Sequence, residues 1–196
     1  LIPMCVFAAG DTVNIADSDD LIAAIKNQQP GQTWVLEAGQ YDVGDGCLDV
    51  EANINGVASG FVFPIFVDDL KIQGNGDVTI TSSYDPGETY GGNWHVQNFI
   101  TIGGDGVTIQ DVKLKGNPNA YYGGECNKVI ELIGGKDLTL NNVECLALTL
   151  EDGTKTSGSI YISSADAGNT ILEDVNFEIH DHEKIAIIGR NGCGKT

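Results

Sequence analysis

The residues best suited to chemistry lie near the end of the chain, where glycines, a lysine and a threonine form a compact motif. Gly189 is followed after four residues by Gly194, Lys195 and Thr196, which is the full spacing of a phosphate-binding loop. The apolar run KIAII precedes it, as a strand before such a loop should. In a complete site, the loop amides and Lys195 hold phosphates and Thr196 binds magnesium. The candidate nucleotide-binding residues are Gly189, Asn191, Gly192, Gly194, Lys195 and Thr196.

The surrounding residues, LEDVNFEI, a short turn and EKIAIIGRNGCGKT, resemble the start of an ABC-type ATPase domain. The resemblance implies ATP and magnesium as ligands only if the stretch belongs to a complete ABC domain. Phosphate binding also needs the helix that follows such a loop, and neither a Walker B strand nor an ABC signature is present. We therefore expect residues 171–196 to be a truncated ABC-like segment that lacks ATPase activity and whose first residues could form the last coil of the preceding domain.

Two loops carry a second set of candidate residues, because aromatic side chains gather in YDPGETYGGNWHVQN and GNPNAYYGGECN. Exposed aromatic rings beside Asn and Asp are typical of sugar-binding surfaces, where apolar ring faces contact the CH-rich faces of sugars. The alternative is that these rings only anchor their own loops. The candidate glycan-binding residues are Tyr84, Tyr90, Trp94, His95, Tyr121 and Tyr122.

A repeated pattern must position both loops. VTIQDVKL starts at Val107, LTLNNVEC at Leu138 and TILEDVNF at Thr170, giving offsets of 31 and 32 residues (138 − 107 and 170 − 138). These offsets lie in the range of repeat architectures. A weaker echo, VTITSSY, starts at Val78, 29 residues before Val107. Each copy alternates apolar and polar residues, breaks for two polar residues and then resumes, which predicts two short strands with a corner between them.

A third short strand precedes each copy, at Ile100 and Ile102, at Ile130 and Leu132, and at Ile160 and Ile162. Three strands per repeat predict an all-β fold, a right-handed parallel β-helix in which equivalent residues stack. We expect two buried columns, one of Val112, Val143 and Val175 and one of Leu114, Cys145 and Phe177. The corner pairs Gln110/Asp111, Asn141/Asn142 and Glu173/Asp174 should stack too, with side-chain amides hydrogen-bonding along the stack.

The beginning of the chain fits this fold. DSDDLIAAIKN predicts a short amphipathic helix capped by Asp17 or Ser18, with Leu21, Ile22 and Ile25 on one face. This helix and the following PGQTWVLEAGQY resemble the opening of proteins of the pectin-lyase-like superfamily, in which the helix caps the open end of the β-helix. We assign residues 11–170 to the β-helix domain. Residues 1–10 are interpreted as a remnant of a signal peptide or, alternatively, as a buried first strand.

Enzymes of that superfamily need a base beside a uronate, or paired carboxylates. The pectate-lyase type uses Arg as the base and calcium held by Asp residues, but residues 1–174 contain no Arg. Lys113 or Lys115 could replace it, although outward lysines are usually solvated. The Gly-His-Gly and Arg-Ile-Lys motifs of the hydrolase type are absent. No catalytic residue is therefore assigned and no cofactor is expected, while calcium between Asp111 and Asp174 stays open.

The composition of the chain disfavours several classes of binding partner. The net charge of −18 disfavours nucleic acids and anionic membranes, and the chain has no run of 18 apolar residues that would predict a membrane span. Five cysteines show no zinc spacing. Cys145 is interpreted as a buried apolar residue, and a bridge from Cys126 to Cys47 or to Cys145 stays open.

Three hypotheses remain. The first is an extracellular or cell-surface β-helix module that binds polysaccharide or cell-surface glycan without catalysis. The second is a polysaccharide lyase or hydrolase with an incomplete active site. The third is a fragment of an ABC-type ATP-binding protein, which by itself would indicate the cytoplasm.

Overall fold

The computed structural model describes residues 8–50, 61–84, 99–115, 128–146, 148–149, 155–156, 159–162 and 170–177. In these ranges the protein is mostly β, with one helix, α1 (Ser18–Lys26). The strands are β1 (Thr12–Ile15), β2 (Thr33–Asp42), β3 (Phe63–Ile65), β4 (Lys71–Thr81), β5 (Ile100–Ile102), β6 (Thr108–Lys115), β7 (Lys128–Leu132), β8 (Thr139–Leu146), β9 (Leu148–Thr149), β10 (Lys155–Thr156), β11 (Ser159–Ile162), β12 (Ile171–Glu173) and β13 (Asn176–Phe177).

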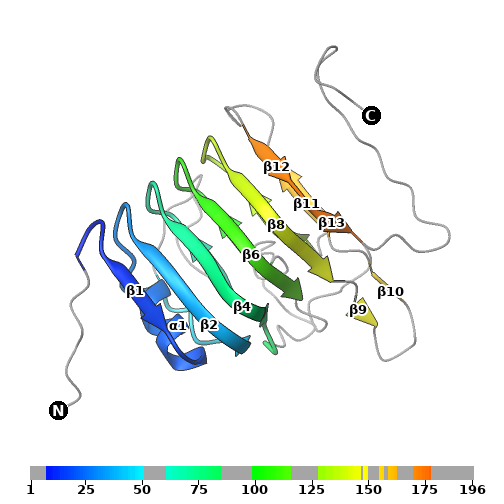
Figure 1. Ribbon diagram of the computed structural model, residues 1–196, viewed down its shortest axis with the longest axis horizontal. Coiled ribbons are helices and arrows are strands. Elements are labelled where there is room, and N and C mark those ends of the chain that lie inside the picture. Colours follow the sequence, from blue (N-terminus) through cyan, green and yellow to red (C-terminus); the bar gives the residue numbers. More distant parts are fainter. Residues whose placement is uncertain are drawn as a thin grey trace.

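Two parallel sheets organise these strands. The large sheet has the order β1-β2-β4-β6-β8-β12, with β13 also pairing with β8, and the small sheet has the order β11-β7-β5-β3. From β2 onward the chain alternates between the two sheets, apart from the antiparallel pair β9 and β10. The strands of the large sheet lie side by side in sequence order, from β1 to β12 (Figure 1). Successive repeats of the sequence therefore stack on one another.

The predicted columns are present in the strand register. Val112 pairs with Val143, Leu114 pairs with Cys145, and Cys145 pairs with Phe177. Four of these residues are buried in one core that the two sheets share, namely Val112, Val143, Leu114 and Cys145. Val175 is partly buried against the same core. The register of Phe177 shows that residues 171–177 extend the large sheet, while the domain boundaries at residues 10 and 170 stay predictions.

The echo at Val78 is aligned differently from the prediction. Lys71 pairs with Thr108, and Thr79 pairs with Lys113, so Val78 corresponds to Val112 and not to Val107. The true offset at the start of the strand is 37 residues (108 − 71). The reason is that β4 has five residues between its two paired segments, where β6 has only two. An alignment of this repeat by sequence alone does not account for the three extra residues, so it matches Val78 with the wrong residue of the next repeat.

A column of left-handed residues stands just before the strands of the large sheet. Gly31, Asp69, Gly106 and Asp137 have φ between 57° and 73°, and each lies two residues before its strand. Glycine and Asp tolerate this region better than most residues. The backbone N–H groups of Gly31, Asp69 and Gly106 donate to the carbonyl of the next repeat at 2.7–2.9 Å. This turn therefore stacks as regularly as the strands do.

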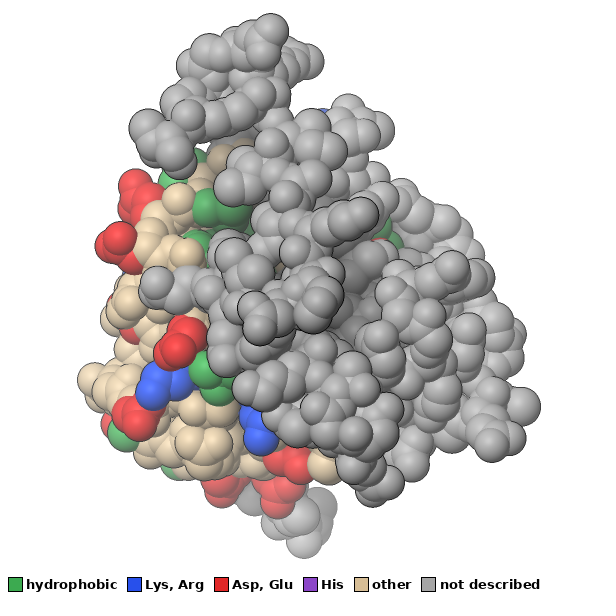
Figure 2. Space-filling view, turned by 90° about the vertical axis from the view of Figure 1, so that its right-hand side faces the viewer, with side chains coloured by type: hydrophobic (Ala, Val, Ile, Leu, Met, Phe, Trp, Pro, Cys, Tyr) green, Lys and Arg blue, Asp and Glu red, His purple; other side chains and the backbone are tan. Residues whose placement is uncertain are grey.

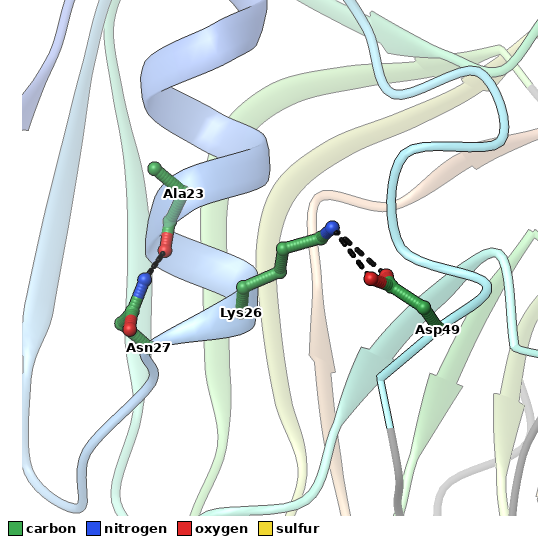
Figure 3. A network of polar contacts seen from close by, with 4 residues as sticks. All are labelled: Ala23, Lys26, Asn27 and Asp49. Carbon is green, nitrogen blue, oxygen red and sulfur yellow. Dashed lines mark hydrogen bonds and ion pairs between the residues drawn. The ribbon is translucent and has the colours of Figure 1, made fainter.

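Helix α1 covers the first repeat, as predicted. The Asp17 side chain caps it by accepting from Asp20 N at 2.9 Å, and Leu21, Ala24 and Ile25 are buried. The helix contacts β1, β2 and β3. At its C-terminal end, Asn27 Nδ2 donates to Ala23 O and Lys26 forms an ion pair with Asp49 (Figure 3). The apolar face of α1 thus closes one end of the shared core.

A membrane-spanning helix is not found in the described residues.

Gly74 gives a test of the close stacking. A Cβ atom on Gly74 would overlap the carbonyl oxygen of Asp111 in the neighbouring strand. Because that oxygen belongs to the backbone, Gly74→Ala should lower the free energy of unfolding by about 1–3 kcal/mol, the usual cost of overpacking. Urea denaturation followed by circular dichroism measures this. The control is Gly39→Ala, whose Cβ would meet its nearest atom, in Tyr41, at an ordinary 3.7 Å; an equal loss in both variants would contradict the stacking argument.

Candidate functional site

The bend in the middle of each long strand is the best-formed polar feature among the described residues. Asp111, Asn142 and Asp174 occupy the bends of three successive repeats, with φ of 58°, 50° and 50°. Short polar side chains are the non-glycine residues best able to adopt this conformation. Gln110 pairs with Asn141, and Asn141 pairs with Glu173. The predicted corner pairs therefore stack as expected.

Side-chain amides join these bends, which confirms the predicted ladder between two of them. Asn142 Nδ2 donates to Asp111 Oδ1 at 2.9 Å, and Gln110 Nε2 donates to Asp111 Oδ2 at 2.9 Å. Both carboxylate oxygens of Asp111 are thus engaged by amide groups. An Asn between two Asp residues also keeps like charges from facing each other in adjacent repeats.

A shallow groove of about 130 Å³ crosses three strands at this bend. Charged and amide side chains from β4, β6 and β8 line it, together with the buried residues Val78 and Val112. The extra residues of β4 supply one wall. The lining residues are Gly76, Asp77, Val78, Asp111, Val112, Lys113, Asn142 and Glu144.

The groove is predominantly acidic, and its lysine is already paired. Lys113 Nζ lies 2.9 Å from Asp77 Oδ1, with both side chains substantially exposed. The hydrogen bond to Asp77 and the charge of Asp77 raise the pKa of Lys113, and Glu144 adds to this effect. Lys113 therefore stays protonated at neutral pH and is poorly suited to act as a general base. Three carboxylates against one lysine leave the groove with negative charge.

The sequence-predicted sites are placed only in part. Tyr84 is partly buried against the core, and its backbone N–H donates to Ser82 Oγ at 3.2 Å. Tyr84 thus anchors the start of its loop, which is the alternative role considered for the aromatic residues. Tyr90, Trp94, His95, Tyr121 and Tyr122 lie outside the described residues, and so do Gly189, Asn191, Gly192, Gly194, Lys195 and Thr196.

The calcium hypothesis stays a prediction. No group of three or more His, Cys, Asp or Glu residues in the described ranges could hold a metal ion. Asp111 and Asp174 are separated by the repeat of Asn142, as expected, and the Asn142 amide nitrogen faces Asp111.

Sequence reasoning missed Asp77 and Glu144. They reach the groove from two different repeats, and their closeness depends on the extra residues of β4. The only signal was Gly74-Asn75-Gly76-Asp77, a glycine-rich insertion inside an otherwise alternating strand.

Sequence reasoning also missed a buried acid on the small sheet. Glu131 alternates with apolar neighbours, so it should face solvent, yet it is only 5% exposed. Its register partner on β5 is Thr101, which is fully buried. Thr101 Oγ1 has no hydrogen-bond partner in the described part of the chain. This face of the small sheet is therefore shielded from water.

A scan against protein-family models found no match for the chain. Among curated proteins, the ATP-binding cassette transporter abc4 of Schizosaccharomyces pombe is 41% identical over 46 residues, which is 24% of this chain. The chain spans 3% of that transporter.

Among solved structures, a pectin methylesterase mutant in complex with a hexasaccharide matches with a TM-score of 0.52 and 14% identity. The match covers 82% of this chain and 48% of that protein, so the chain spans about half its length. A PL6-family alginate lyase matches with a TM-score of 0.41 and 14% identity, over 85% of this chain and 20% of that protein. The parallel sheets and the match to the pectin methylesterase structure are consistent with a parallel β-helix fold.

The two described cysteines should be chemically inert in the folded protein. Cys47 and Cys145 are free, buried thiols, whereas Cys126, the partner in both bridges considered from the sequence, lies outside the described residues. Burial raises the pKa of both from 9.0 to about 12. At pH 8 we expect iodoacetamide to leave these two residues unmodified until denaturant is added, as read by mass spectrometry of the peptides. Modification of either thiol in the native protein at the rate of a solvent-exposed cysteine would contradict this.

The same shift predicts how stability depends on pH. Because the pKa of each thiol is higher in the folded than in the unfolded state, the thiols contribute fully to the free energy of unfolding below pH 9. This contribution is lost as the pH rises toward 12.

Proposed function

We propose that the chain is a right-handed parallel β-helix module with an N-terminal capping helix, which binds a glycan without cleaving it. The observation that carries the proposal is the groove across β4, β6 and β8. Its polar groups come from consecutive repeats, whose neighbouring strands are about 4.8 Å apart. Carboxylate and amide groups that neighbouring strands contribute to one surface suit a polymer with repeating hydroxyl groups.

The charge of the groove narrows the ligand class. Asp77, Asp111 and Glu144 would repel the carboxylates of a uronate polymer, and the net charge of −18 would slow its approach. The ligand is therefore a neutral or amino-sugar polysaccharide. The similar pectin methylesterase was solved with a hexasaccharide. This supports an oligosaccharide as a ligand of this kind of fold, whereas the proposed charge of the ligand rests on the groove alone.

Three observations support binding without catalysis. Residues 1–174 contain no Arg, Lys113 is held protonated by Asp77, and Asp111 is engaged by two amides. The groove thus offers hydrogen-bonding groups, and its one lysine is not free to act as a base. A polysaccharide-binding role also agrees with an extracellular or cell-surface location, which we propose for the chain.

A glycan array with the full chain tests this proposal. We expect binding to neutral or amino-sugar polysaccharides, and no release of unsaturated uronate or reducing ends from the bound polymer. The double variant Lys113→Ala/Glu144→Ala should bind about tenfold more weakly, which corresponds to about 1.4 kcal/mol. The matched control is Asp19→Ala, which removes an exposed charge on α1.

Two outcomes would overturn the proposal. Equal weakening in the groove variant and the α1 variant would show that the groove does not govern binding. Cleavage of a bound polysaccharide would show that the protein is a lyase or hydrolase.

A second candidate function is nucleotide binding by residues 189–196, which carry the spacing of a phosphate-binding loop; a stretch of 46 residues of the chain also matches an ATP-binding cassette transporter. On that reading the full chain binds Mg-ATP with micromolar affinity, and Lys195→Ala abolishes binding because the lysine contacts the phosphates. On the first reading, titration with a fluorescent ATP analogue gives no saturable signal. Micromolar affinity that survives Lys195→Ala would contradict both.

A further inference from the structure

The outer face of the large sheet carries two rows of mostly uncharged side chains in the half of each strand that precedes the bend. The strand register places one residue from each of β1, β2, β4, β6 and β8 in each row. The hydroxyl-rich row consists of Thr12, Thr33, Lys71, Thr108 and Thr139. The amide-rich row lies two residues further along each strand and consists of Asn14, Val35, Gln73, Gln110 and Asn141. We call these ten side chains the flat face.

The flat face is open to solvent. In every strand the residue between the two rows is buried in the core, so the row residues point outward. Thr12 and Asn14 are exposed, and the other eight residues are half-buried by their neighbours. The strands that carry them lie side by side and run in nearly the same direction (Figure 1). The two rows therefore form a continuous, accessible surface.

Charge distinguishes this face from the rest of the chain. Nine of its ten residues are uncharged and the tenth is Lys71, whereas the whole chain has a net charge of −18. Beyond the bend, the same sheet presents Asp77, Lys113 and Glu144. Figure 2 shows lysine and acidic side chains gathered in the lower part of its left-hand edge, the side of the molecule that faces the viewer in Figure 1. A second copy would bring another charge of −18 to the flat face, so an uncharged ligand suits it better.

The spacing of the two rows suits a polymer of hydroxyl groups. Neighbouring strands lie about 4.8 Å apart, and residues two apart along a strand lie about 6.6 Å apart. Hydroxyl and side-chain amide groups both donate and accept hydrogen bonds, as sugar hydroxyls do. The methyl groups of Thr and Val35 add apolar contacts between these polar groups. A chain of sugar rings that extends as a flat ribbon can contact such a surface along its length, whereas a coiled chain contacts it only at points.

The flat face is continuous with the groove. Gln110 and Asn141 of the amide-rich row directly precede Asp111 and Asn142, which line the groove. At this junction Gln110 Nε2 donates to Asp111 Oδ2 at 2.9 Å, which orders the Gln110 side chain. A ligand on the flat face can therefore also reach the polar groups of the groove.

We propose that the flat face and the groove form one binding surface for an uncharged, ribbon-like polysaccharide of the cellulose type. This inference rests on the proposed glycan binding and narrows its ligand class from neutral or amino-sugar polymers to neutral polymers with an extended chain. It also assigns a binding role to residues outside the groove, such as Val35 and Thr139.

Co-sedimentation of the full chain with microcrystalline cellulose tests this inference. We expect the chain to sediment with cellulose and not with insoluble starch, whose chains coil. Val35→Arg and Thr139→Arg should each weaken capture at least about tenfold, because a long side chain holds the ribbon off the face. The matched control is Gln40→Arg, which adds the same side chain to an exposed position of β2 beyond the bend and should leave capture unchanged. Thr139→Ser keeps the hydroxyl and should also be captured, and circular dichroism checks the fold of each variant.

The outcomes separate this inference from the proposed function. Equal capture of Val35→Arg, Thr139→Arg and Gln40→Arg would overturn the inference, as would equal sedimentation with starch or a loss of capture in Thr139→Ser as large as in Thr139→Arg. If the wild-type chain does not sediment with cellulose but binds soluble oligosaccharides on the glycan array, the flat face has no such role and the proposed function of the groove stands. If it binds no glycan in either assay, both fail.

Discussion

The alignment of each bend on the next is the constraint on which the rest of the structure depends. A bend needs a residue in the left-handed region, and Asp111, Asn142 and Asp174 provide it at equivalent positions of three repeats. Because side chains alternate along a strand, a slip of one residue would turn every buried residue outward. The Asn142 amide that holds Asp111 therefore does more than satisfy two polar groups. It also links two bends in the register that keeps Val143 and Cys145 buried.

Much of this register could be predicted from the sequence, because the period and the polar break mark it directly. The pairing of Leu114 with Cys145 and of Cys145 with Phe177 follows from counting along three similar segments. The counting fails at β4, since its bend holds three more residues than that of β6. Alternation alone also predicts Glu131 as exposed. Its burial depends on what covers the outer face of the small sheet, and no local pattern records that.

The candidate groove shows a different limit of sequence reasoning. Asp77, Lys113 and Glu144 lie on three strands, far apart in the chain, and only stacking brings them to one surface. Aromatic loops were easier to single out, because their composition is unusual over a short stretch. Of those residues only Tyr84 is placed, and it packs against the core.

The long bend of β4 has a consequence for how such a chain can change. The three extra residues bulge outward, yet Lys71 and Thr79 on either side keep their partners in β6. The large sheet therefore accepts length variation at this bend without transmitting it to the strands. Mutations that add or remove residues here would reshape one wall of the groove while sparing the core. The same position is a natural graft point, where a foreign recognition loop could be built into the surface with its anchor strands already held in place.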